Sequence, residues 1–236
     1  MNPLEAIDHR SAWRADSSSA DTFTVSLSAK HLDAIDRAVR HVQSLDIEVE
    51  SITRDQFELP DIREDVAQWR NEVMWGTGII ILDGFPVDSY SKEEMGIVHW
   101  GLGTHFGTAM SQSVMGDRLG HVINVGGKDP KERAYRNSLE LAMHTDACDV
   151  VAMMSLRTAR EGGESGYVSA ISIYNEVLRR APELMPVLMD GYFYHRFGEE
   201  EPGASPVTEQ KIPVFSFEKG YLSVNFLRSY IEMAAE

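Results

Sequence analysis

Hydrophobic residues recur at helical spacing through roughly the first hundred residues of the chain. A first amphipathic helix is predicted to follow Ser28, a residue type that caps helix N-termini. The hydrophobic face of this helix comprises Leu32, Ile35, Val39 and Val42. A second helix is predicted over residues 62–74, with Val66, Trp69 and Val73 on one face. Ser91 and Glu94 form a capping-box pattern, which predicts the start of a third helix.

The pattern changes after about residue 104 to short apolar runs separated by glycine, aspartate and charged turns. These runs predict strands over residues 120–127, 139–146, 149–159, 166–172, 191–197, 211–218 and 220–226. An earlier glycine-bounded aliphatic run, residues 76–86, predicts a buried strand. Helical segments are expected over residues 172–181, 182–191 and 227–236. Helices followed by many short strands favour a mainly β fold, a sandwich or jelly roll supported by N-terminal helices.

Composition narrows the class of protein. The chain has 236 residues, of which 43% are hydrophobic and 25% charged, as expected of one globular domain. A net charge of −15 disfavours nucleic acid and anionic membranes as partners. The single cysteine, the lack of a secretory signal and the lack of a membrane-length apolar run favour a cytoplasmic protein. The oligomeric state is not determined by these features.

His144 and Asp146 are the candidate metal ligands. Residues i and i+2 of a strand project to the same face, so an imidazole and a carboxylate at this spacing can bind one ion. Two histidines and one carboxylate are the ligands of non-haem Fe(II) oxygenases. In a chain with 8 histidines, however, a His-x-Asp triplet can also arise by chance, as a surface turn capped by aspartate. Cys148 nearby is interpreted as a small, partly buried strand residue rather than a nucleophile.

The surrounding sequence resembles a known family. The stretch "LAMHTDACDVVAMMSLRTAREGGESGYVSAISIYNEVLRR" is similar to the taurine/2-oxoglutarate dioxygenase (TauD/TfdA) family. The similarity rests on His-Thr-Asp at 144–146, the apolar run after it and "GGES" at 162–165. It extends to "GIIILDGFPVDSYSKEE" and to "PVFSFEKGYLSVNFLRSYIE", and so covers roughly residues 75–232.

The resemblance implies a double-stranded β-helix, a form of jelly roll, in a single domain over residues 1–236. Residues 1–75 would be a mainly helical lead-in, and residues 76–236 the jelly-roll core. It implies an oxygenase that uses Fe(II) and 2-oxoglutarate to oxidise a C–H bond of a small organic substrate, with release of succinate and CO2. His144 and Asp146 match the metal ligands, and Asp146 separates the chain from halogenases, which have a small residue there. Ser165 matches the position, usually threonine, that contacts 2-oxoglutarate.

The chain departs from the family pattern after Asp146. The family has a second metal-binding histidine and, shortly after it, an arginine that anchors 2-oxoglutarate. His195 is the one histidine that follows Asp146, and the arginine next to it, Arg196, would point the other way on a strand. The chain is therefore expected to lack the C-terminal strands that carry these two residues, to leave an open sheet edge and to be inactive by itself. The alternatives are a non-catalytic jelly roll that binds a ligand or partner and, with less support, a zinc hydrolase.

Overall fold

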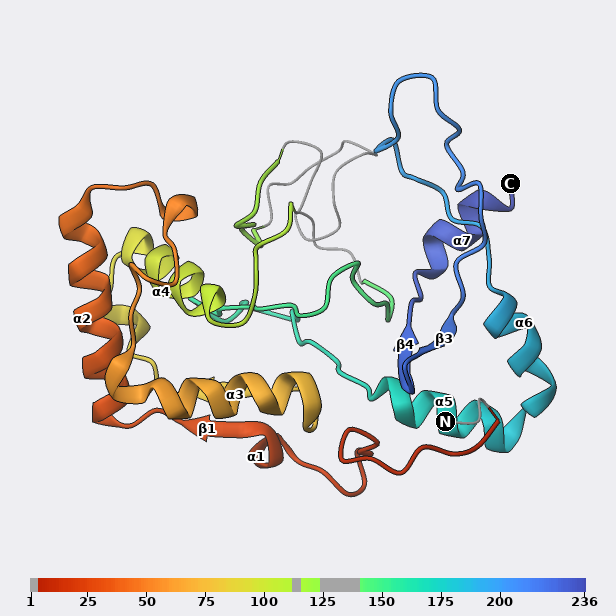
Figure 1. The fold of residues 1–236 in the computed structure, drawn as a ribbon, viewed down its shortest axis with the longest axis horizontal. Helices are drawn as coiled ribbons and strands as arrows, with labels where there is room; N and C mark the ends of the chain where they lie inside the picture. The colour runs from red at the N-terminus through yellow and green to blue at the C-terminus, as the bar shows by residue number, and fades with distance from the viewer. Residues whose placement is uncertain (1–3, 112–115, 124–140) are drawn as a thin grey trace. The chain divides into compact units, whose positions relative to one another are not determined.

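The structure is a computed structural model that describes residues 4–111, 116–123 and 141–236. The chain divides into two compact units (Figure 1). The first, here called the N-terminal unit, comprises residues 13–120 and 149–165. The second, the C-terminal unit, comprises residues 1–12, 121–148 and 166–236. The His-Thr-Asp motif therefore belongs to the C-terminal unit and the "GGES" turn to the N-terminal unit.

The N-terminal unit consists of helices and one pair of short strands. In chain order its elements are α1 (Ala20–Phe23), β1 (Thr24–Ser26), α2 (Ala29–Leu45), η1 (Val49–Ser51), η2 (Pro60–Ile62), α3 (Arg63–Trp75), β2 (Ile81–Asp83), η3 (Val87–Ser89) and α4 (Lys92–Thr104). The strands β1 and β2 pair in parallel, with Thr24 opposite Ile81. All three helices predicted from hydrophobic spacing are present as α2, α3 and α4.

Local capping determines where two of these helices begin. The backbone N–H of Ser28 donates to His31 Nδ1 at 3.0 Å, while the Ser28 hydroxyl accepts from the His31 N–H. Ser91 and Glu94 form the predicted capping box, in which the Ser91 N–H donates to the Glu94 carboxylate at 2.8 Å. Each box satisfies N–H groups that have no partner within the helix, so these two starts are encoded locally.

The core of the N-terminal unit lies between α2, α3 and α4. Ile35, Val39 and Val42 of α2 are buried, as the spacing predicted. The indole of Trp100 on α4 donates to the Ile52 carbonyl at 2.9 Å, which satisfies its only polar atom inside the core. The strand predicted over residues 76–86 is confirmed as β2, but it is not fully buried: Ile81 is 40% exposed, whereas Leu82 packs against the core.

The C-terminal unit is built on a helical pair and a hairpin. Its elements are α5 (Ala170–Arg180), η5 (Pro182–Leu184), α6 (Met185–Asp190), β3 (Phe215–Glu218), β4 (Tyr221–Val224) and α7 (Arg228–Ala234). The strands β3 and β4 are antiparallel, and both residues of their turn, Lys219 and Gly220, have positive φ (51° and 88°). Such turns match the natural twist of a hairpin.

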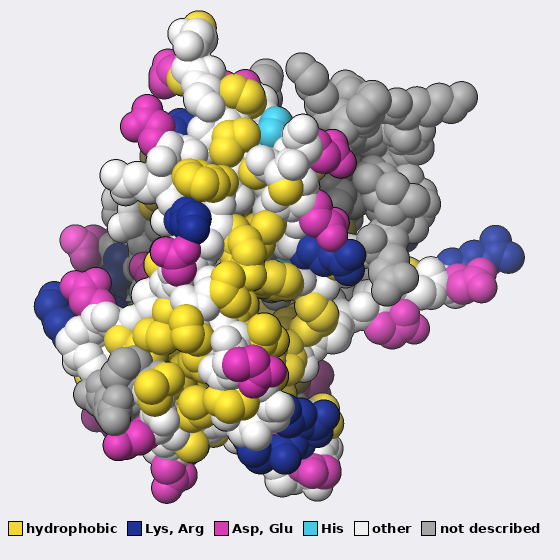
Figure 2. All heavy atoms as spheres, turned by 90° about the vertical axis from the view of Figure 1, so that its right-hand side faces the viewer, with side chains coloured by type: hydrophobic (Ala, Val, Ile, Leu, Met, Phe, Trp, Pro, Cys, Tyr) yellow, Lys and Arg dark blue, Asp and Glu magenta, His cyan; other side chains and the backbone are white. Residues whose placement is uncertain are grey.

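The core of this unit is centred on Tyr174 of α5. Its ring meets those of Phe215 and Phe217 edge to face, with centroids 5.3 and 5.6 Å apart. Asn175 ties the N-terminal segment to α5 through hydrogen bonds to both the N–H and the carbonyl of Ile7. Figure 2, in which the right-hand side of Figure 1 faces the viewer, shows hydrophobic side chains gathered on this face. Large exposed hydrophobic residues of this unit include Leu184, Val187, Phe193 and Tyr221.

Several predicted strands are wrong. Residues 149–155 have no regular secondary structure, and the segment over 166–172 leads instead into α5. The apolar run at 149–159 contains Val151 and Met153, which are 55% and 64% exposed and so do not face a core. The strands predicted over 120–127 and 139–146 fall partly outside the described residues, and their described parts form no strand.

The described residues therefore form helices and few strands, in two separate two-stranded sheets. The jelly roll specifically stays a prediction. Within the described ranges no helix is both long and apolar enough to cross a membrane.

Two glycines of α4 make a matched test of its packing. A methyl group on Gly101 would overlap the Phe57 ring, whereas one on Gly103 would meet nothing within 4 Å. We expect Gly101→Ala to lower the free energy of unfolding by about 1–3 kcal/mol through overpacking. Gly103→Ala should raise it by about 0.5–1 kcal/mol, because alanine favours the helix. Urea denaturation measures both, and equal effects would contradict the close contact between α4 and Phe57.

Two histidines of α4 and its C-cap predict a pH dependence of stability. Burial lowers the pKa of His99 and that of His105, whose Nε2 also contacts the Phe57 carbonyl at 2.8 Å. With a lowered pKa in the folded state, the unfolded chain binds more protons as the pH falls below the ordinary histidine value of about 6.5. Urea midpoints should therefore be lower at pH 5.5 than at pH 7.5. His99→Leu should reduce this difference between the two urea midpoints. An unchanged difference would show that His99 does not cause the pH dependence.

Candidate functional site

His144 and Asp146 lie together in the segment 141–147 of the C-terminal unit. His144 Nε2 is 3.5 Å from Asp146 Oδ1, so the two side chains project to the same side, as their spacing predicted. The segment is not a strand, however, so the expected strand geometry is not what brings them together. The side chains are 25% and 53% exposed, which leaves both accessible from solvent.

The ring of His144 is oriented by its own segment. Its Nδ1 lies 2.8 Å from the carbonyl oxygen of Ala142. A carbonyl oxygen only accepts, so Nδ1 carries the hydrogen and, in the neutral ring, Nε2 holds a lone pair. Metal-binding histidines commonly donate their other ring N–H to a carbonyl or carboxylate in this way. The lone pair of Nε2 and the carboxylate oxygen therefore converge as two metal-ligand donors.

This donor pair fits a divalent ion. Metal bonds to histidine nitrogen and carboxylate oxygen are about 2.0–2.2 Å long, so two ligand atoms 3.5 Å apart are able to bind one ion. Nitrogen with carboxylate oxygen is also the ligand chemistry of non-haem Fe(II) sites. Among the described residues no group of three or more His, Cys, Asp or Glu side chains is placed to hold a metal ion. The pair thus accounts for two positions on a metal.

Thr145, between the two candidate ligands, makes a double contact with Phe226. Its N–H donates to the Phe226 carbonyl at 2.9 Å, and its hydroxyl accepts from the Phe226 N–H at 2.8 Å. Both backbone polar groups of Phe226 are thereby satisfied by one residue, although the two positions are 81 residues apart. Sequence reasoning missed this role, because a threonine between two ligands gives no sign of its distant partner.

Phe226 in turn is attached to the core of the unit. Its ring packs against the buried cluster that contains Tyr174 and Phe215. The N–H of the preceding residue, Asn225, donates to the Val214 carbonyl at 3.0 Å. The motif is therefore connected through Thr145 to the end of the β3–β4 hairpin.

His195 has the opposite ring state from His144. Its Nδ1 accepts the Phe197 N–H at 2.9 Å, so in the neutral ring the hydrogen lies on Nε2. Its own backbone N–H donates to the Tyr230 carbonyl, and the Tyr230 ring stacks on Phe197. In this ring state His195 offers no lone pair at Nε2, and the expectation that it is not the distal metal ligand stays a prediction.

Ser165 and Cys148 are both exposed. Ser165 follows the "GG" turn of the N-terminal unit, where Gly162 and Gly163 both have positive φ (67° and 82°). Its contact with 2-oxoglutarate stays a prediction. Cys148 is neither on a strand nor buried, so the interpretation of it as a partly buried strand residue is wrong.

Two methionines near the motif are exposed as Cys148 is: Met143 is 51% exposed and Met153 is 64% exposed. Met154, by contrast, packs against the core of the N-terminal unit.

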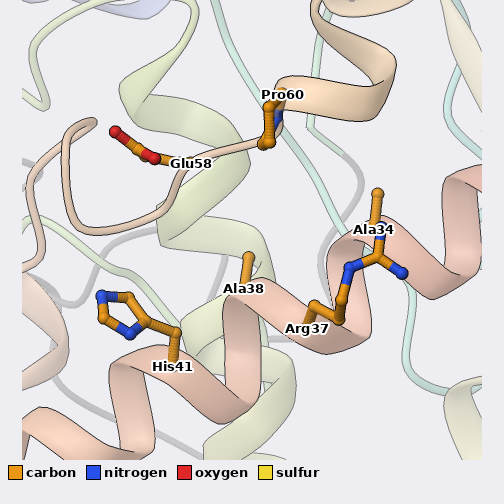
Figure 3. Close-up of a pocket in the computed structure, with 6 residues that line it drawn as sticks. All are labelled: Ala34, Arg37, Ala38, His41, Glu58 and Pro60. Atoms are coloured by element: carbon orange, nitrogen blue, oxygen red, sulfur yellow. The ribbon is translucent and has the colours of Figure 1, made fainter.

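A separate hollow lies on the surface of the N-terminal unit. It has a volume of about 250 Å³, and Figure 3 shows four α2 residues on one side of it with Glu58 and Pro60 opposite. The α2 residues are Ala34, Arg37, Ala38 and His41. The guanidinium of Arg37 is already paired with Asp61, and none of the predicted site residues lines this hollow. It is therefore not the candidate site.

Comparison with known proteins assigns the family. A family model described as "Taurine catabolism dioxygenase TauD, TfdA family" matches residues 39–232. The chain belongs to this family. The match includes His144 and Asp146, draws on both compact units and begins well before residue 75, where the resemblance was expected to start.

Two curated proteins are similar to this family member. FR-33289 synthase of Streptomyces rubellomurinus is 32% identical over 228 residues, which is 94% of this chain and 67% of that protein. The taurine hydroxylase-like protein SAT17 of Stachybotrys chartarum is 23% identical over 192 residues, 77% of this chain and 50% of that protein. The chain thus spans about two thirds of one relative's length and half of the other's.

The exposure of Asp146 predicts that it contributes little to folding. We expect Asp146→Ala to change the free energy of unfolding of the metal-free protein by less than about 0.5 kcal/mol, since surface side chains and exposed ion pairs contribute little. The buried Phe215→Ala in the same unit should cost about 3–5 kcal/mol and serves as the control. Urea denaturation gives both values. A loss above about 2 kcal/mol for Asp146→Ala would make Asp146 a structural cap.

Proposed function

We propose that this protein is an Fe(II)- and 2-oxoglutarate-dependent oxygenase that oxidises a C–H bond of a small organic substrate and releases succinate and CO2. The observation that carries the proposal is the convergence of His144 Nε2 and Asp146 Oδ1 at 3.5 Å, within the His-Thr-Asp motif of a TauD, TfdA family chain. Both atoms are electron-pair donors of the kinds that Fe(II) binds in such enzymes.

His144 and Asp146 have distinct roles in this proposal. The Ala142 carbonyl holds the His144 ring with Nε2 directed at the shared site, so no rearrangement of the ring precedes binding. Asp146 supplies a negative charge that partly balances a divalent cation. When bound, Fe(II) with 2-oxoglutarate supplies the dioxygen chemistry, in which decarboxylation of the co-substrate is coupled to oxidation of the C–H bond. The exposure of both side chains leaves room beside them for small molecules.

Ser165 is proposed as a contact of 2-oxoglutarate. Its hydroxyl is a hydrogen-bond donor to carboxylate oxygen, the same group that the usual threonine of the family supplies. Support comes from its exposure and from its place directly after "GGE", a turn made of two consecutive residues with positive φ.

The substrate class is proposed only as a small organic molecule. One relative is named a taurine hydroxylase-like protein, so taurine and other sulfonates belong in a substrate screen beside carboxylates and amino acids. The chain spans about two thirds of one relative's length and half of the other's, so the complete activity is stated here as a proposal.

The test of this proposal separates binding from turnover. Anaerobic addition of Fe(II) and 2-oxoglutarate to the purified protein should give a weak visible charge-transfer band. Admitting oxygen should then yield succinate, in larger amounts when a screened compound is a substrate. His144→Ala and Asp146→Ala should reduce both signals to background, because each removes one metal ligand.

His195→Asn is the matched control, because asparagine keeps a polar side chain at this position and His195 is not a metal ligand in the proposal. It should retain the band and the succinate. If 2-oxoglutarate binds but succinate never forms, the non-catalytic ligand-binding alternative is correct. Stoichiometric zinc in the purified protein, with an activity lost on chelation, would favour the hydrolase.

A further inference from the structure

The residue between the two candidate ligands is held more firmly than either ligand. Thr145 makes two hydrogen bonds to Phe226, at 2.9 and 2.8 Å, one through its backbone and one through its side chain. His144 has a ring contact to Ala142 within its own segment, and Asp146 is 53% exposed. The contact that links this motif to the core therefore runs through Thr145.

The hydroxyl of Thr145 takes the place of a backbone carbonyl. In an antiparallel bridge, two residues exchange N–H···O=C bonds in both directions. Here one of the two acceptors is Oγ1, so the bridge to Phe226 closes through a side chain. A segment without regular structure thereby obtains the two-bond attachment that a strand would have.

This attachment also determines where the neighbouring side chains point. His144 and Asp146 are each joined to Thr145 by one planar peptide bond, so holding Thr145 at both its N–H and its hydroxyl restricts the backbone from which the two side chains project. His144 and Asp146 do project to one common side, with their donor atoms 3.5 Å apart. Losing one of the two hydrogen bonds would let the segment rotate and the two donors separate.

We propose that Thr145 is a positioning residue that holds His144 and Asp146 in register for one metal ion through its hydroxyl bond to Phe226. The inference rests on the proposed metal site and adds to it a residue that touches neither the metal nor the substrate. The inference attributes the positioning role of Thr145 to its side-chain hydroxyl.

The test uses the affinity for Co(II), a spectroscopic substitute for Fe(II) that needs no turnover. Thr145→Val keeps the shape of the side chain but removes the acceptor, whereas Thr145→Ser keeps the hydroxyl. We expect Thr145→Val to weaken Co(II) binding by about 10- to 100-fold, the range typical for residues that orient metal ligands. Thr145→Ser should stay within about threefold of the unchanged protein and keep its visible Co(II) spectrum.

Folding is measured on the same samples by circular dichroism, and Thr145→Ala replaces Thr145→Val if the valine variant does not fold. If folded Thr145→Val or Thr145→Ala binds Co(II) as tightly as the unchanged protein does, the positioning role is overturned, while the proposed metal site stands. Failure of both variants to fold would make Thr145 a folding residue and would overturn it as well. If Co(II) affinity is unchanged in His144→Ala and Asp146→Ala, the proposed metal site itself is wrong.

Discussion

The candidate site depends on the pair of hydrogen bonds between Thr145 and Phe226. The segment that carries His144 and Asp146 belongs to no helix or sheet, so its backbone groups find partners through tertiary contacts or water. Thr145 makes that contact with a residue 81 positions away, at the end of the β3–β4 hairpin. The packing of Phe226 against the core of the C-terminal unit then gives the motif a fixed support.

Two histidines of the C-terminal unit, His144 and His195, show how a single hydrogen bond determines which ring nitrogen carries the hydrogen. His144 donates from Nδ1 to a carbonyl and keeps a lone pair at Nε2, beside a carboxylate. His195 accepts at Nδ1 from a backbone N–H and therefore carries its hydrogen at Nε2. The Nε2 atom is thus an electron-pair donor in the neutral ring of His144 and an N–H donor in that of His195.

The two units differ in how much of their structure is local. In the N-terminal unit, α2 and α4 begin at capping boxes and bury stripes of helical periodicity, so neighbouring residues encode the elements. In the C-terminal unit the core joins residues distant in sequence, such as Ile7 with Asn175 and Tyr174 with Phe215. The candidate metal ligands His144 and Asp146 are found in this second unit, where contacts between distant residues hold their segment.

The sequence by itself determined the capped and periodic helices and the two strands on either side of Lys219 and Gly220, which follow from residues close in the chain such as a capping serine. It also predicted that His144 and Asp146 project to one side, although the segment that holds them is not the expected strand. The apolar run at 149–159 misled, because alternation predicts a strand only where a partner strand and a core are present, and Val151 has neither in the described structure. The orientation of the His144 ring comes from a carbonyl oxygen only two residues away. Only the tertiary structure decided that Thr145 meets Phe226, since hydrogen bonds between distant residues depend on how the whole chain folds.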